Sequence, residues 1–237
     1  MSHVEQRLHR QLNLRAKQGT LRSLISQTTE ESTCNLIDFS SNDYLGLARS
    51  RKQLKEVQVA FDSYLQDSQE TYGDSKSPEK PLLGATGSRL LSGNSSYPRQ
   101  LERKLAKIHN RPSALLCNSG YDANLSILSS IPLEEDIILM DELVHNSLVM
   151  GVRMGRVKQE NVRYFRHNDV EHLKQLLMQL RKVISLRGRS IFVVCESVYS
   201  MDGDIAPLGA ILDCALDSCA SVSNMHALNK SWGHSKS

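Results

Sequence analysis

The chain has 237 residues, of which 40% are hydrophobic and 23% charged, a balance typical of a folded globular protein that argues against wholesale disorder. Its 29 Lys and Arg residues and 26 Asp and Glu residues give a net charge of +3, and the basic side chains are scattered, so a nucleic-acid partner is not expected. The N-terminus lacks the apolar segment of a signal peptide, and no stretch is long enough to span a bilayer, so we expect a cytoplasmic protein without a membrane partner.

The first part of the chain is predicted to form helices joined by polar segments. Apolar residues spaced among charges predict a loosely amphipathic helix over 3–18. The apolar run 36–39 enters a polar cluster, which is typical of a strand that ends in a turn. A second helix is predicted over 51–65, followed by a polar loop.

The middle of the chain alternates between short apolar runs and helical patterns. A helix capped by Ser95 or Ser96 comes first. The strands predicted after it are 113–117, 137–140, 162–165 and 190–195, and the helices are 121–130, 145–154, 169–184 and 207–217. This alternation predicts an α/β fold in three layers, a mostly parallel sheet flanked by helices, with ligands bound at the carboxyl ends of the strands. After Asp217 no further strand is predicted.

Three segments at the predicted ligand edge carry candidate functional residues. In Asn118–Asn124, Gly120 permits close approach, and the free N–H groups of the helix start can hold a phosphate, although an ordinary turn between strand and helix has the same pattern. His145 follows a strand and can stack on a planar ligand or transfer a proton, or simply cap a helix. The segment Glu196–Asp204 gathers hydroxyls and carboxylates, or forms a plain turn. His167 is weaker, since a histidine beside a helix start is commonly solvated.

Neither a disulfide framework nor a metal site is predicted. The five cysteines are an odd number without a CxxC pair, and Cys117 and Cys195 lie inside apolar runs, where we expect them to be buried. EF-hand spacing and clusters of His and Cys are missing from the sequence. A nucleotide-binding dehydrogenase is disfavoured, because no GxGxxG follows a strand.

Together, six segments resemble the α-oxoamine synthases in order and spacing. They are Phe39–Leu47, Gly84–Gly93, Ser119–Asn124, His145–Ser147, His167–Val170 and Ser200–Asp204. The resemblance implies a pyridoxal-phosphate (PLP) enzyme, homodimeric, that condenses an amino acid with an acyl-CoA or related acyl thioester and releases carbon dioxide. The amino-acid sequences of the segments are most similar to those of members that use alanine and a pimeloyl thioester in biotin biosynthesis. The family pattern has a His where this chain has Tyr97-Pro98, which is a small departure.

The resemblance also assigns roles to individual residues. It implies that Gly120 and Tyr121 donate backbone hydrogen bonds to the PLP phosphate, that His145 stacks on the pyridine ring and that Ser200 hydrogen-bonds the cofactor. By position, Arg22 contacts the substrate and Asn42 lies near the amino-acid carboxylate. The matched domains are an N-terminal helix and arm at 1–50 and a partial PLP-binding large domain at 51–217, followed by an unmatched, disordered tail at 218–237.

The family's Schiff-base lysine and the aspartate that pairs with the pyridine nitrogen have no counterpart in the matched segments. We therefore expect a truncated chain without a catalytic lysine that is inactive alone, and Lys230 is expected to be a solvated lysine rather than a substitute. The alternatives are a non-catalytic chain that binds PLP weakly or pairs with an intact synthase subunit, and a synthase of the same family that uses another amino acid and thioester.

Overall fold

The computed structural model describes residues 2–22, 41–70, 84–184, 189–217 and 221–222. The chain forms two compact units, Met1–Gly84 and Ala85–Ser237. These units are groups of residues in contact, and the predicted domain boundaries stay predictions. No helix in the described ranges is long and apolar enough to cross a membrane.

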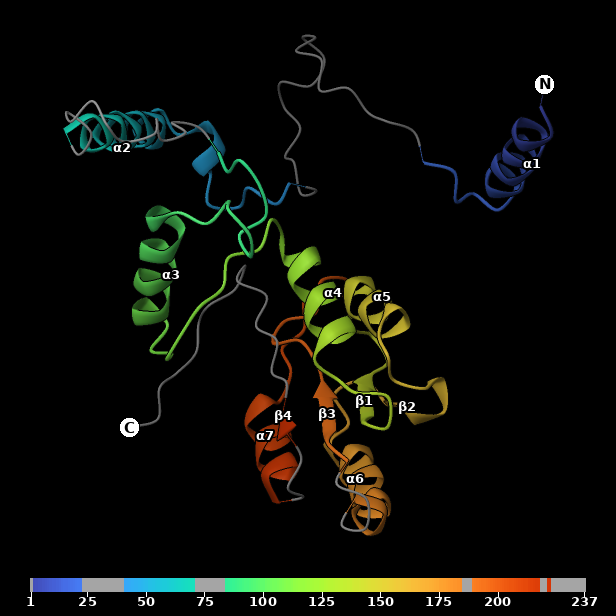
Figure 1. The fold of residues 1–237 in the computed structure, drawn as a ribbon. Coiled ribbons are helices and arrows are strands. Elements are labelled where there is room, and N and C mark those ends of the chain that lie inside the picture. Colours follow the sequence, from blue (N-terminus) through green and yellow to red (C-terminus); the bar gives the residue numbers. More distant parts are fainter. Residues whose placement is uncertain (1, 23–40, 71–83, 185–188, 218–220, 223–237) are drawn as a thin grey trace. The chain divides into compact units, whose positions relative to one another are not determined.

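In the described part of the first unit, two helices flank a short 3-10 turn, η2 (Leu47–Arg49) (Figure 1). Helix α1 (His3–Lys17) begins at a capping box, in which the Ser2 side chain accepts the Glu5 amide and the Glu5 carboxylate accepts the Ser2 amide. This helix confirms the prediction for residues 3–18. Helix α2 (Arg51–Glu70) confirms the second predicted helix and continues five residues beyond the predicted end at residue 65.

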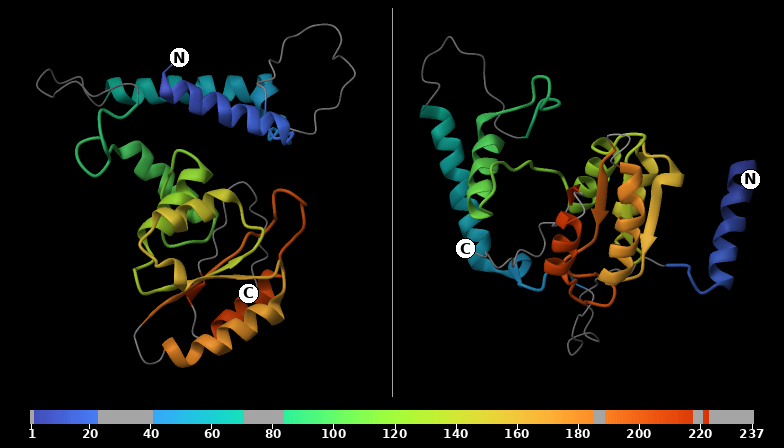
Figure 2. Two further views of the ribbon diagram at one scale, coloured as in Figure 1. Left: turned by 90° about the vertical axis from the view of Figure 1, so that its right-hand side faces the viewer. Right: turned by 90° about the horizontal axis from the view of Figure 1, so that it is seen from below.

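The second unit is built on a four-stranded parallel sheet. Its strands are β1 (Ile137–Asp141), β2 (Val162–Phe165), β3 (Ile191–Val194) and β4 (Ser221–Val222), in the order β2-β1-β3-β4. Its helices are α3 (Ser96–Ile108), α4 (Gly120–Ser130), α5 (Asn146–Met154), α6 (Val170–Ile184) and α7 (Leu208–Asp217), with a 3-10 turn η3 (Gln159–Asn161) before β2. Helices α4 and α5 lie on one face of the sheet and α6 and α7 on the other (Figures 1 and 2). The predicted three-layer α/β fold is confirmed.

The core lies on both faces of the central strand. All five residues of β1 are buried, because β2 and β3 pair with its two edges and helices cover its two faces. Strand β2 has one neighbour in the described sheet, and its Arg163 and Tyr164 are exposed. A continuous apolar run in the sequence therefore indicates a strand that is covered by helices on both faces of the sheet.

Two strand predictions are wrong in this unit. Residues 113–117 form no strand, because a strand needs a hydrogen-bonded neighbour and the segment has none among the described residues. The Leu116 amide instead donates to the Glu102 carboxylate at 2.9 Å, and Glu102 is paired with both terminal nitrogens of Arg89 at 2.6 and 2.9 Å.

The second correction concerns the segment after Asp217, where no strand is predicted. The structure has the two-residue strand β4 there, with Ser221 opposite Phe192 and Val222 opposite Val193. Two residues are too few to show a periodic pattern, so this strand has no signal in the sequence. The strand predicted at 36–39 lies outside the described residues.

Candidate functional site

The start of α4 has the geometry of an anion-binding turn. Ser119 is the N-cap of the helix, and its Oγ accepts the Asp122 amide at 3.0 Å. The amides of Gly120 and Tyr121 have no acceptor within the helix, because they lie in its first turn. A Cβ at Gly120 would meet no heavy atom within 4 Å, so the space beside the Gly120 Cα is open. Free N–H groups and the positive end of the helix dipole together favour a phosphate at this position.

His145 lies beside this turn. Its ring centroid is 6.2 Å from that of Tyr121, and the two rings are nearly perpendicular, at 85°. His145 is also the N-cap of α5, and its Nδ1 accepts the Ser147 amide at 3.2 Å. Because Nδ1 is the acceptor in this bond, the neutral ring carries its proton on Nε2.

A buried pair of polar side chains joins the two helices behind His145. The side-chain amide of Asn124 donates from Nδ2 to Ser147 Oγ at 2.9 Å, and that oxygen lies 2.7 Å from His145 Nδ1. Asn124 is only 7% exposed and Ser147 fully buried. Since buried polar groups hold fixed positions only when they are paired, this contact orients the His145 ring relative to the start of α4.

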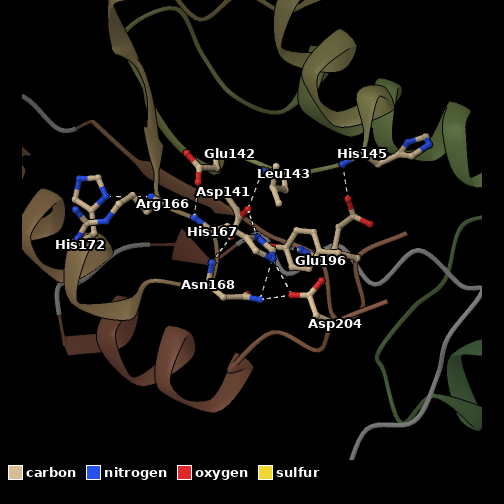
Figure 3. A network of polar contacts seen from close by, with 11 residues as sticks. Asp141, Glu142, Leu143, His145, Arg166, His167, Asn168, His172, Glu196 and Asp204 are labelled. Atoms are coloured by element: carbon tan, nitrogen blue, oxygen red, sulfur yellow. Dashed lines mark hydrogen bonds and ion pairs between the residues drawn. The ribbon is translucent and has the colours of Figure 1, made fainter. Parts of the chain in front are cut away.

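Glu196 connects His145 to the neighbouring strand. The His145 amide donates to the Glu196 carboxylate, which follows the buried Cys195 at the end of β3 (Figure 3). The loop after β1 and the loop after β3 are thus tied together at the carboxyl edge of the sheet, where folds of this class bind ligands.

Ser200 is exposed at the tip of a hairpin that runs from Val198 to Ile205. The Tyr199 amide donates to the Asp204 carbonyl at 3.0 Å, and the Gly203 amide donates to the Tyr199 carbonyl at 3.0 Å. Gly203 has φ +74°, a backbone angle that residues with a side chain rarely adopt. No hydrogen bond among the described residues joins Ser200 to His145 or Tyr121, so its predicted contact with a cofactor stays a prediction.

A network of polar side chains at the same edge was not predicted from the sequence. Asp141 ends β1, His167 follows β2, and Asp204 lies in the hairpin after β3. The His167 ring lies between them, with Nδ1 2.8 Å from Asp141 Oδ1 and Nε2 2.7 Å from Asp204 Oδ2 (Figure 3). Asn168 joins the network through its backbone, which donates to Asp141 Oδ2 at 2.8 Å, and its side chain, which donates to Asp204 Oδ2 at 2.6 Å.

The charge on His167 follows from this geometry. Partial burial lowers the pKa of His167, but the hydrogen bonds and charges of Asp141 and Asp204 outweigh it and raise the pKa above its ordinary value of 6.5. Both ring nitrogens face carboxylate oxygens that accept hydrogen bonds, so only the doubly protonated ring satisfies both. The prediction that His167 is a solvated histidine is wrong.

The two substrate-binding candidates belong to the other compact unit. Asn42 and Arg22 are both exposed in Met1–Gly84. Their predicted roles therefore stay predictions, and Lys230 lies outside the described residues.

The two cysteines in apolar runs of the sequence differ in their exposure. Cys195 is fully buried, as predicted, and burial raises the pKa of its thiol to about 12. Cys117 is exposed, so the prediction that it is buried is wrong; its segment forms no strand and enters no sheet. Among the described residues, no group of three or more His, Cys, Asp or Glu side chains is arranged to hold a metal ion.

Comparison with known proteins gives consistent relatives. An 8-amino-7-oxononanoate synthase of Emericella nidulans is 41% identical over 175 residues, which cover 73% of this chain and 39% of that protein. The 8-amino-7-oxononanoate synthase 2 of Bacillus subtilis is 38% identical over 177 residues, which cover 75% and 39%. The chain thus spans about 40% of the length of these curated relatives.

Solved structures give the same fold. A serine palmitoyltransferase from S. paucimobilis, solved with PLP and myriocin bound, superposes with a TM-score of 0.55 at 30% identity, over 69% of this chain and 37% of that one. The Sphingomonas wittichii serine palmitoyltransferase gives a TM-score of 0.58 at 27% identity, over 77% and 39%. Residues 35–218 match the family model described as aminotransferase class I and II. Since this match spans well over half of the sequence, the resemblance drawn from the six motifs is confirmed, and the chain belongs to the aminotransferase class I and II family.

Proposed function

We propose that this chain forms the phosphate-binding and ring-stacking part of a PLP site in an acyltransferase of the 8-amino-7-oxononanoate synthase type. The observation that carries the proposal is the placement of His145 beside the first turn of α4, which contains the amides of Gly120 and Tyr121. A helix start suits the phosphate dianion, and a flat ring nearby suits the pyridine ring.

The residues of the chain would act mainly by holding and orienting. Gly120 and Tyr121 donate their amides to the phosphate, and His145, held by Ser147 and Glu196, presents its face to the pyridine ring. Ser200 offers a hydroxyl from the hairpin. By family position, Asn42 would lie near the amino-acid carboxylate and Arg22 would contact the substrate. When bound, PLP supplies an electron sink for the charge that develops at the amino-acid Cα.

The relatives suggest which substrates are involved. Curated relatives named 8-amino-7-oxononanoate synthase favour alanine and a pimeloyl thioester, in biotin biosynthesis. The solved serine palmitoyltransferases favour the alternative of another α-oxoamine synthase, of the serine palmitoyltransferase or 2-amino-3-ketobutyrate CoA ligase type. A homodimer is part of the proposal through the family, and a cytoplasmic location is part of it through the sequence of the N-terminus.

Comparing PLP with pyridoxal tests the proposal directly. Equilibrium dialysis of the 237-residue chain is expected to show tighter binding of PLP than of pyridoxal, because only PLP carries the phosphate that the start of α4 would hold. His145→Ala is expected to weaken PLP binding about fivefold, equivalent to about 1 kcal/mol of ring contact. His9→Ala changes an exposed histidine of α1 and serves as the matched control. Equal binding of the two ligands, or an unchanged affinity in His145→Ala, would contradict the proposal.

A second experiment separates catalysis from the alternative of a non-catalytic chain. The chain is mixed with PLP, reduced with borohydride and digested, and the peptides are searched for a lysine adduct by mass spectrometry. The expected result is no adduct concentrated on a single lysine, as the resemblance implies. Such an adduct would show that the chain holds a Schiff-base lysine, and alanine-dependent release of free thiol from an acyl thioester would show catalysis by the chain itself. Co-elution with an intact synthase on a sizing column would favour the pairing alternative.

A further inference from the structure

We propose that His167 is a positioning residue whose ring bridges Asp141 and Asp204 and thereby fastens the hairpin that carries Ser200 to the ends of β1 and β2. This inference rests on the proposed function, because Ser200 is the residue through which the hairpin would reach the cofactor. Its basis is the geometry of the network and not the resemblance, which assigns no role to His167, Asp141 or Asp204.

Asp141 is the fixed end of the bridge. It is fully buried at the end of the central strand, and its carboxylate accepts the Leu143 amide at 2.9 Å and the Asn168 amide at 2.8 Å. A buried carboxylate is stable only with compensating donors or a counter-charge. The His167 ring supplies the positive charge at 2.8 Å.

Asp204 is the more exposed end of the bridge. Its side chain is 36% exposed, and it receives His167 Nε2 at 2.7 Å and the Asn168 side chain at 2.6 Å. The Tyr199 ring of the same hairpin packs perpendicular to the His167 ring, with centroids 4.4 Å apart. Both sides of the hairpin therefore contact one imidazole, and Ser200 directly follows Tyr199.

Asn168 holds the loop in the shape that makes the bridge possible. Its φ of +55° lies in the left-handed region, which Asn tolerates better than most residues. From this position its amide reaches Asp141 while its side chain reaches Asp204. The loop after β2 thus contacts both carboxylates at two points each, through consecutive residues.

The bridge is expected to depend on pH. The groups that face the His167 ring are Asp141 from β1, Asp204 and Tyr199 from the hairpin, and the Asn168 side-chain nitrogen, which lies 3.2 Å from Nε2. The His167 backbone amide donates to the Glu142 carboxylate at 3.1 Å. At the helix side of the loop, Arg166 is paired with Asp169 at 2.6 Å. Since the pKa of His167 is raised, the charged ring is complete below that pKa and is lost as the pH rises through it.

Nuclear magnetic resonance of the full 237-residue chain tests the bridge itself. The ¹⁵N shifts of the His167 ring are expected to report two protonated nitrogens at pH 6.5 and a single transition at higher pH. The Tyr199 and Ala206 amides close the hairpin, and their hydrogen exchange is the second readout. As the pH rises through the transition, their exchange is expected to speed up by more than the ordinary base catalysis of amide exchange accounts for. A ring with one protonated nitrogen at pH 6.5 would overturn the proposal.

Variants connect the bridge to the cofactor. His167→Gln keeps a donor but no charge, and is expected to remove the pH transition in hairpin exchange and to weaken PLP binding about fivefold, the equivalent of one hydrogen bond. Asp204→Asn, at the more exposed end, is expected to act in the same direction while leaving the buried Asp141 contacts in place. His9→Gln is the control and is expected to change neither readout.

The two proposals fail in different ways. If the parent chain shows the pH transition in the hairpin but no preference for PLP over pyridoxal, the proposed function is wrong and the bridge stands as a structural clamp without a role for the cofactor. If the parent binds PLP and both variants leave hairpin exchange and PLP affinity unchanged, His167 is not a positioning residue.

Discussion

Asp136 shows how much one buried carboxylate can organise. It is 6% exposed, immediately before β1, and accepts the Leu133 amide at 2.7 Å and the Ser190 amide at 2.9 Å. Ser190 in turn accepts the Ile137 amide at 2.9 Å. A single side chain therefore aligns the beginnings of β1 and β3, at the end of the sheet opposite the candidate site.

Replacing this carboxylate tests its contribution. Asp136→Ala is expected to lower the free energy of unfolding by about 2 kcal/mol, because two amides lose a buried acceptor. Glu134→Ala is the control: this exposed carboxylate, 3.3 Å from Lys158, is expected to contribute less than about 1 kcal/mol. Urea unfolding measures both values, and equal losses in the two variants would contradict the argument.

The candidate site was only partly predictable at this scale. Gly120 and Tyr121 could be predicted, because a helix start is a local pattern that sequence displays. The role of His167 could not, because its two carboxylate partners lie 26 and 37 residues away along the chain. The signal that was present is that Asp141, His167 and Asp204 all follow predicted strands, which places them at the same edge of a parallel sheet without showing which side chains touch.

At the scale of elements, α4 and α5 pack so closely that glycine is required between them. A Cβ added at Gly155, just after α5, would lie 2.9 Å from the Leu128 carbonyl oxygen and 3.2 Å from the Ser129 Cα. These are backbone atoms of α4, which cannot move aside as a flexible side chain can. Close packing of the helices keeps Asn124 within hydrogen-bond distance of Ser147 behind His145.

This packing predicts opposite effects for two substitutions of the same kind. Gly155→Ala is expected to lower the free energy of unfolding by about 1–3 kcal/mol through overpacking. Gly209→Ala lies in α7, where a Cβ would meet nothing within 4 Å, and is expected to leave stability unchanged or raise it by up to about 1 kcal/mol. Thermal unfolding of both variants checks the pair, and a Gly155→Ala protein as stable as the parent would show that α4 and α5 can separate freely.

The elements themselves were largely predictable, since most helices and strands have strong periodic patterns. Strand β1 was predicted one residue short and α7 one residue early. The failures have a common physical cause. Whether a segment forms a strand depends on a neighbouring strand that can pair with it, and the segment's own residues do not reveal that neighbour. Residues 113–117 have the amino-acid composition of a strand, but they pair with no strand of the described sheet. Strand β4 pairs with β3, although its two residues lack the composition typical of a strand.

At the scale of the whole molecule, the two compact units contribute unequally to the core. Every buried hydrophobic residue among the described ranges lies between Ala106 and Ala215, within Ala85–Ser237. No residue of α1 is buried. Global stability is therefore expected to come from the second unit.

A matched pair of truncations measures this asymmetry. Ile138→Ala removes a fully buried side chain from the central strand and is expected to lower the free energy of unfolding by about 2–5 kcal/mol. Leu8→Ala removes a side chain that is 58% exposed in α1 and is expected to change it by less than about 0.5 kcal/mol. Comparable losses in urea unfolding would show that α1 shares the cooperative transition.

The Glu102 carboxylate accepts the Leu116 amide, and this hydrogen bond takes the place of the one that a neighbouring strand would make. The hydrogen bond from Arg89 lowers the pKa of Glu102 to about 2, with help from the Leu116 amide. A lowered pKa means that the contact is present above the ordinary carboxylate range and is lost only as the pH falls toward 2. Because Leu116 lies three residues before the cap of α4, the approach to the phosphate-binding turn should keep its shape in acid that already neutralises ordinary surface carboxylates. In a pH series the Leu116 amide would then be an acid-resistant reporter, and its protection would outlast the protonation of those surface groups.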